Sequence, residues 1–110
     1  MSENWHINYS KEARQDILSI KNYFLLKSLS HTLINSKVKK ILDTIDTLTT
    51  FPNRHQRYMD EPWYSYGIRF MPIDNFIVFY LPDNRSKNIL ISRIMTSKNN
   101  FSQSLSLNHP

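Results

Sequence analysis

The sequence predicts an α+β domain in which a two-helix hairpin packs on one face of a mostly antiparallel, twisted sheet. Three observations lead to this prediction. Residues 5–10 alternate between apolar and polar side chains, as a half-buried strand does, and two stretches of helical periodicity follow. Three short apolar runs separated by turn residues then complete the pattern. The order is therefore β-α-α-β-β-β, and 110 residues suit one domain, residues 1–110.

Each predicted helix has one apolar face. The first follows Ser10, a suitable N-cap, and ends near Lys27. The second begins near Thr32 and ends near Thr50, because Pro52 disfavours helical geometry in the residue before it. The apolar stripes are Ala13, Ile17, Ile20 and Phe24 in the first helix, and Ile34, Val38, Ile41, Ile45 and Leu48 in the second.

The second half of the chain predicts three strands. Asp74 and Asn75 suit a hairpin turn between the first two, since both residue types tolerate a positive φ. Pro72 cannot donate a hydrogen bond to a sheet, so its strand should end there or lie at an edge. With both helices on one side, the opposite sheet face remains for function or for a partner. The predicted strands are 66–71, 76–81 and 88–95.

Two segments have no periodic pattern. Residues 51–64 are predicted to form a loop, and an aperiodic loop of this length is usually functional or mobile. Residues 97–110 are predicted to form a polar C-terminal tail. The loop is thus a natural source of binding residues, and its candidates are Arg54, His55, Arg57, Tyr58, Glu61 and Trp63.

The composition excludes several kinds of site. The absence of cysteine rules out disulfides and thiolate chemistry, and the single glycine, Gly67, rules out glycine-rich phosphate loops. No apolar run approaches the ~18 residues of a membrane span, so we expect a cytoplasmic protein without a signal peptide. The histidines His6, His31, His55 and His109 lie on separate elements, which predicts no metal site and no cofactor.

Positive charge gathers toward the C-terminus. The formal net charge is +5, and Asp83 is the last acidic residue. A segment of one sign favours a nucleic acid or an acidic protein as partner, although a solvated basic surface is an equally good explanation of the composition. The basic residues after Asp83 are Arg85, Lys87, Arg93 and Lys98.

Four segments, in this order, resemble the RelE/ParE superfamily of bacterial toxins from type II toxin–antitoxin systems. They are "YSKEARQDILSIKNYF", "FPNRHQRYMDE", "IRFMPIDNFIVFY" and "ILISRIM". The third is the most specific. The resemblance implies a toxin that inhibits bacterial growth unless its cognate antitoxin wraps an acidic or amphipathic segment around it.

Members of this superfamily divide by target. RelE-like toxins cut mRNA in the ribosomal A site, whereas ParE-like toxins poison DNA gyrase. Ribosome-dependent members place a catalytic arginine where this sequence has Ile77, and the histidine or tyrosine and arginines that often follow the last strand are replaced by Thr96, Lys98 and Asn99. These departures favour gyrase inhibition by protein contact. The alternatives are a ribosome-dependent endonuclease with a rearranged basic site, and a degenerate member that only binds its antitoxin.

A metal-independent endoribonuclease would need a base, an acid and cations that bind the phosphate. His55 and Glu61 could serve as acid and base, and Tyr58 or Trp63 could stack on a nucleobase. Solvent-exposed loop residues are the simpler interpretation of His55 and Glu61. The candidate cations are Arg69, Arg93 and Lys98, and Arg54 and Arg57 join them as candidates for target or nucleic-acid binding.

The two strand arginines also have a structural interpretation. Arg69 and Arg93 could pair with acidic residues of this chain instead of meeting a partner. Arg69 alternates with Ile68 and Phe70, so its side chain should project from the sheet face opposite to theirs. The acidic partners considered for the two arginines are Asp60, Glu61 and Asp74.

Overall fold

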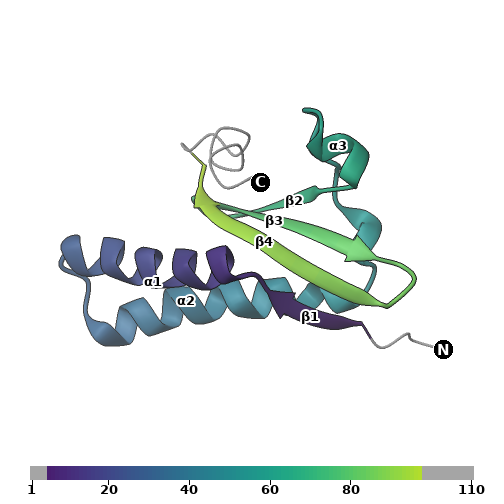
Figure 1. Ribbon diagram of the computed structural model, residues 1–110. Helices are drawn as coiled ribbons and strands as arrows, with labels where there is room; N and C mark the ends of the chain where they lie inside the picture. Colours follow the sequence, from purple (N-terminus) through teal and green to yellow (C-terminus); the bar gives the residue numbers. More distant parts are fainter. Residues whose placement is uncertain (1–4, 98–110) are drawn as a thin grey trace.

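The structure is a computed structural model that describes residues 5–97. Figure 1 shows a long helix hairpin on one side of a four-stranded sheet and a short helix on the other side. The predicted α+β class and the predicted element order are confirmed. The strands are β1 His6–Tyr9, β2 Arg69–Ile73, β3 Phe76–Asp83 and β4 Asn88–Thr96, and the helices are α1 Lys11–Leu26, α2 His31–Asp46 and α3 Trp63–Tyr66.

Serine side chains begin both long helices. The Ser10 hydroxyl accepts a hydrogen bond from the Ala13 amide at 2.9 Å, and Ser30 caps α2 in the same way. The second helix ends at Asp46, earlier than predicted, and a 3-10 turn at Thr47–Thr49 continues it. Within residues 5–97, no helix combines the length and apolar character that a membrane crossing requires.

The strand order is β1-β4-β3-β2, with β1 parallel to β4 and the other pairs antiparallel. This arrangement confirms the mostly antiparallel sheet. It also confirms the edge position of Pro72, because β2 is the last strand. Phe79 pairs with Arg93 whereas Tyr80 pairs with Ile91, so Ser92 is an extra residue that forms a β-bulge.

The main core lies between the helix hairpin and the sheet. The stripe residues Ile41 and Ile45 of α2 pack there against Val78, Tyr80 and other strand residues. Tyr80 has no exposed surface, although it carries a hydroxyl group. The remaining fully or nearly buried members include Ala13, Ile20, Leu48, Met71, Ile73, Phe76, Ile89, Ile91 and Ile94.

The opposite sheet face is partly covered, contrary to the expectation that it remains open. A second apolar cluster forms there from Trp63 of α3 together with Ile68, Phe79 and Met95. Each of these four side chains is at most 7 % exposed. The reason is that the segment 51–64 folds back over the sheet instead of extending away from it.

The segment predicted as a loop contains short regular elements. A 3-10 turn covers Pro52–Arg54, and α3 begins at Trp63. The Tyr58 amide donates to the Ile68 carbonyl at 2.8 Å, and the Phe70 amide donates to the Gln56 carbonyl at 3.1 Å. These bonds occupy part of the free edge of β2, so the segment is tied to the sheet.

Candidate functional site

Arg93 is held inside the molecule by an acidic residue of α1. Its Nε and Nη2 atoms donate to the two carboxylate oxygens of Asp16 at 2.8 and 2.9 Å. Both side chains are largely buried, with 16 % and 13 % exposed. The hydrogen bond to Asp16 raises the pKa of Arg93, whereas burial lowers it. The effect of Asp16 is the larger one, so the pKa of Arg93 is raised. Arg93 therefore fastens α1 to β4.

Arg69 and Arg93 lie on opposite faces of the sheet. Arg69 pairs across the strands with Tyr80, which faces the helices, whereas Arg93 pairs with Phe79, which faces the second cluster. The Arg69 side chain points away from the sheet face that carries Ile68, as the alternation of the two residues predicted. The structure does not bring these two arginines into one site.

His55 lies between two arginines, Arg54 and Arg69, near the start of β2. Arg69 Nη1 donates to the His55 carbonyl at 2.5 Å, and Arg54 Nε donates to His55 Nε2 at 3.2 Å. Partial burial, followed by the charges of Arg54 and Arg69, lowers the pKa of His55. A histidine with a lowered pKa is neutral near pH 7, and its Nε2 accepts the bond from Arg54.

Tyr80 is the neighbour of this cluster inside the core. Its ring meets the His55 ring edge to face at 6.2 Å, and its hydroxyl donates to the Pro52 carbonyl at 2.8 Å. Burial raises the pKa of Tyr80 to about 12, against the opposing charges of Arg69 and Arg54. The sequence analysis did not single out Tyr80 for this site, because an apolar strand predicts only a core role for its aromatic residues.

The remaining loop candidates lie away from His55 or have other contacts. Glu61 accepts hydrogen bonds from the Ser65 amide and hydroxyl at 3.0 and 2.9 Å, which stabilises the first turn of α3. Arg57 lies over the Tyr64 ring at 4.4 Å and donates to the Tyr64 carbonyl. Glu61 therefore does not approach His55 in an acid and base pair.

The aromatic candidates of the loop belong to the second cluster. Trp63 is 7 % exposed, and Tyr58 packs edge to face against Phe79 at 5.6 Å and Phe70 at 6.4 Å. Trp63 is therefore too buried to stack on a nucleobase, and Tyr58 packs against two other rings of the sheet. Lys98 lies outside the described residues.

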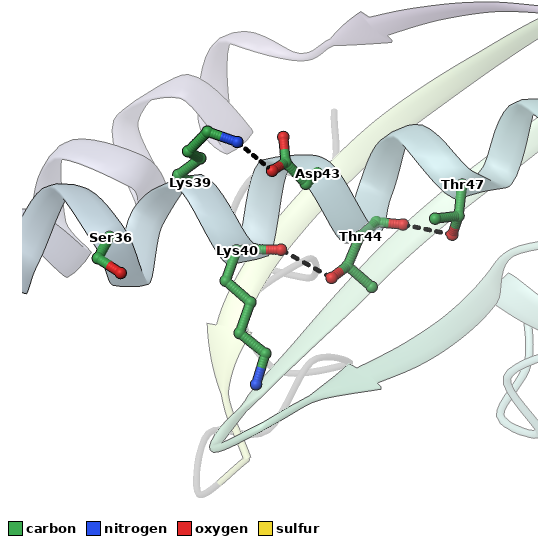
Figure 2. A pocket seen from close by; sticks show the side chains of 6 residues that line it. All are labelled: Ser36, Lys39, Lys40, Asp43, Thr44 and Thr47. Atoms are coloured by element: carbon green, nitrogen blue, oxygen red, sulfur yellow. Dashed lines mark hydrogen bonds and ion pairs between the residues drawn. The ribbon is translucent and has the colours of Figure 1, made fainter.

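A shallow hollow of about 400 Å³ runs along the outer side of α2. In Figure 2, Lys39 points to Asp43, while Lys40 extends to the other side of the helix. Lys40 pairs with Asp74 at 2.8 Å, and Thr44 donates to the Lys40 carbonyl. The polar groups here largely satisfy one another, so this hollow offers little to a ligand.

A larger groove of about 1020 Å³ lies between the helix hairpin and the tip of the β2–β3 hairpin. Its floor contains Phe24 and Phe76, whose rings meet edge to face at 5.9 Å. Lys27 and Lys37 lie on its rim, over the rings of Tyr23 and Phe24. Within residues 5–97, neither lysine has a carboxylate in ion-pair distance. The groove thus joins an aromatic floor to a basic rim.

No group of three or more His, Asp or Glu residues in the described part of the chain is arranged to hold a metal ion. Besides Tyr80, the residues that the sequence analysis missed are Asp16 and Phe51. Asp16 lies in the predicted first helix, where an acidic residue is typical of the positive helix end, and Phe51 begins the segment predicted as a loop. Phe51 is 74 % exposed and adopts a left-handed φ of 56°.

Comparisons with a family model and with solved structures lead to the same kind of protein. Residues 7–101 match a family model described as "ParE toxin of type II toxin-antitoxin system, parDE". A comparison with curated protein sequences gives no match. A chain of the chromosomal ParDE toxin–antitoxin system from P. aeruginosa is similar in structure, with a TM-score of 0.68 and 18 % identity, covering 84 % of this chain and 95 % of that chain.

A chain of the RelBE2 toxin–antitoxin complex from Mycobacterium tuberculosis is also similar. Its TM-score is 0.57 at 15 % identity, and the alignment covers 86 % of this chain and 99 % of that chain. At such low identities the two structural similarities establish the fold, and the match to the family model establishes the family.

Proposed function

Since the chain belongs to the ParE toxin family of type II toxin–antitoxin systems, we propose that it inhibits bacterial growth by binding DNA gyrase through protein contact. In this proposal the protein acts in the cytoplasm and is silent while its cognate antitoxin is bound. It needs no cofactor and no catalytic residues, because contact with the target is sufficient.

The observation that carries this proposal is the position of Ile77. The resemblance implies a catalytic arginine at this place in ribosome-dependent members of the superfamily. Here Ile77 packs on the second cluster, beside Phe79 and Met95. An apolar surface at this place offers no cation to a scissile phosphate. The separation of Arg69 from Arg93 supports the same conclusion.

An RNA-cleaving function remains the second candidate because of one observation. His55 has a lowered pKa and lies between Arg54 and Arg69, so it becomes a neutral base next to two cations once Arg54 Nε turns from His55 Nε2 to a substrate phosphate. A general base and phosphate-binding cations are two of the three requirements for metal-independent RNA cleavage. A nuclease of this kind would use Arg54, His55 and Arg69, without Arg93 or Glu61.

We propose that the antitoxin docks in the groove between the helix hairpin and the β2–β3 hairpin. Its aromatic floor and its rim lysines, Lys27 and Lys37, suit an acidic, amphipathic segment. The toxin–antitoxin systems named in the two structural comparisons support a protein partner of this kind. Replacing both lysines by glutamate should abolish antitoxin binding in a pull-down, and unchanged binding would place the antitoxin elsewhere.

The experiment that tests the target is a short induction of the protein in bacteria that lack the antitoxin. Growth arrest with intact mRNA, together with loss of plasmid supercoiling activity by purified gyrase, is the expected result. New mRNA 5′ ends within translated codons, mapped by primer extension, would instead identify a nuclease. Normal growth would indicate a member that only binds its antitoxin.

A further inference from the structure

Arg54 is held in place by three neutral acceptors. Its guanidinium donates to the Thr47 hydroxyl at 2.8 Å, the Thr50 carbonyl at 3.2 Å and His55 Nε2 at 3.2 Å. These bonds connect the end of the α2 region to the loop that follows it. A guanidinium has five N–H donors, so this anchoring leaves some of them for another acceptor.

Arg69 approaches the same histidine from the sheet. It donates to the His55 carbonyl, and the charges of Arg54 and Arg69 both act on the ring of His55 and on the hydroxyl of Tyr80. Within residues 5–97, no carboxylate lies in ion-pair distance of either guanidinium. Two cations therefore lie beside a neutral histidine, and no described acidic side chain balances their charge.

An exposed aromatic residue, Phe51, begins the short turn that contains Arg54. Its carbonyl accepts a hydrogen bond from the Arg54 amide at 3.2 Å, which fixes the short turn between them. Its side chain is 74 % exposed, and its left-handed backbone is an unfavourable conformation for a residue of this type. An exposed aromatic residue beside arginine has the composition of a binding hot spot.

We propose that Arg54 and Arg69 form an oxyanion site that receives a carboxylate side chain of the target protein, with Phe51 as the adjacent apolar contact. This inference rests on the proposed function, since it assumes that the target is a protein. The site lies at the end of the β2–β3 pair marked by Arg69 and Tyr80, whereas the groove assigned to the antitoxin lies at the other end, by Asp74 and Phe76.

The arrangement of charge favours a carboxylate over the backbone of a nucleic acid. A planar guanidinium matches a carboxylate through two parallel hydrogen bonds, so two arginines suffice for one acidic side chain. A nucleic-acid groove needs a row of cations that follows successive phosphates. The next arginine, Arg57, is instead turned over the Tyr64 ring and donates to the Tyr64 carbonyl.

The test is an NMR titration of the isotope-labelled full chain with an acetylated oligoglutamate. Resonances of the Arg54 and Arg69 Nε–H groups and of the His55 amide should shift, and an oligoglutamine of equal length should not shift them. Replacing Arg54 by Gln should weaken the binding of oligoglutamate roughly three- to tenfold, as the loss of one hydrogen bond of ordinary strength does. Arg54→Lys should weaken it as well, because lysine cannot form the two parallel bonds.

Arg85→Gln is the matched control, since it removes one positive charge from the exposed turn after β3 and should leave the affinity almost unchanged. Thermal melting of each variant distinguishes a folding defect from a binding defect. Equal weakening by Arg54→Gln and Arg85→Gln would overturn the site, as would tighter binding of an oligothymidine at the same resonances. Because the titration does not involve gyrase, its failure and the failure of the supercoiling test are separate results.

Discussion

Arg93 and Asp16 form a two-point ion pair that joins β4 to α1 across 77 positions of the sequence. The same Asp16 carboxylate also accepts the amide N–H of Ile94 at 2.9 Å. Beyond Tyr9, β1 no longer covers the edge of β4, and α1 takes its place there. One carboxylate thus satisfies both a side chain and an edge amide.

The first prediction concerns the stability that this pair provides. Asp16→Ala should lower the free energy of unfolding by about 3 kcal/mol, because it leaves a buried guanidinium and a backbone amide without an acceptor. Arg93→Ala should cost less, since Asp16 keeps the Ile94 amide. Urea denaturation measures both values. Lys39→Ala, which breaks the exposed pair with Asp43, is the control and should have little effect. Equal losses for Asp16→Ala and Lys39→Ala would show that the buried pair is not stabilising.

The second prediction is a loss of stability in alkali that depends on Tyr80. The pKa of Tyr80 is about 12 in the folded protein, above the ordinary value of 10.0. The folded state therefore favours the neutral phenol, and this contribution is present below pH 10 and is lost as the pH rises toward 12. Tyr80→Phe should weaken that pH dependence, measured by denaturation at successive pH values.

Tyr9 contributes to the same loss of stability in alkali, since burial raises its pKa to about 12 as well. A Tyr9→Phe variant should show a similar partial loss of the pH dependence, and the double variant a larger one. At neutral pH, Tyr80→Phe should cost about 1–2 kcal/mol, because the Pro52 carbonyl loses its donor. An unchanged alkaline profile in the double variant would contradict the role of the two phenols.

The third prediction concerns the protonation of His55. Its pKa lies below the ordinary value of 6.5 because of burial, Arg54 and Arg69. A lowered pKa means that the folded state favours the neutral ring, so this contribution to stability is present above pH 6.5 and is lost as the pH falls. Titration of the ring protons by NMR measures the pKa directly. Arg54→Gln should raise it toward 6.5, and a pKa that does not move would show that Arg54 is too distant to act on it.

The fourth prediction separates stability from activity at Phe51. Its positive φ is unfavourable for a residue with a Cβ atom, and glycine removes this cost, so Phe51→Gly should stabilise the fold by up to about 1 kcal/mol. Growth inhibition should fall nonetheless, because the exposed ring is lost. Ser28 also has a positive φ, and Ser28→Gly should stabilise the fold without changing growth inhibition. Melting temperatures and a dilution-plating assay provide the two measurements.

The spacing of apolar residues predicted the helices and strands of this fold, and the structure shows that the residues so spaced are the buried ones. The stripe Ile34, Val38, Ile41 and Ile45 is buried along α2 as its spacing required. The superfamily was predictable too, since four segments carried the resemblance and the family model matches residues 7–101. Both inferences depend on patterns that are local in the sequence.

The contacts of the site were not predictable in the same way. Asp60, Glu61 and Asp74 were the acidic residues considered for Arg93, but the partner is Asp16 on α1. Asp74 pairs with Lys40 instead. The choice depends on how α1 passes along the edge of β4, which is a tertiary relationship and leaves no periodic signal. The second cluster was missed for the same reason, because Trp63 reaches the sheet only when its segment folds back.

The bulge at Ser92 determines how β4 tolerates changes of length. Ile91 and Ile94 both face the helices although three positions separate them, because the bulge absorbs one residue; in a regular strand two residues at this spacing would point to opposite sides. Deleting Ser92 would leave Ile91 and Ile94 two positions apart, so Arg93 and Ile94 would keep their present faces. Ser92 is therefore the position at which β4 can lose one residue and keep both faces, whereas deleting Met95 would turn the residues after it to the opposite face.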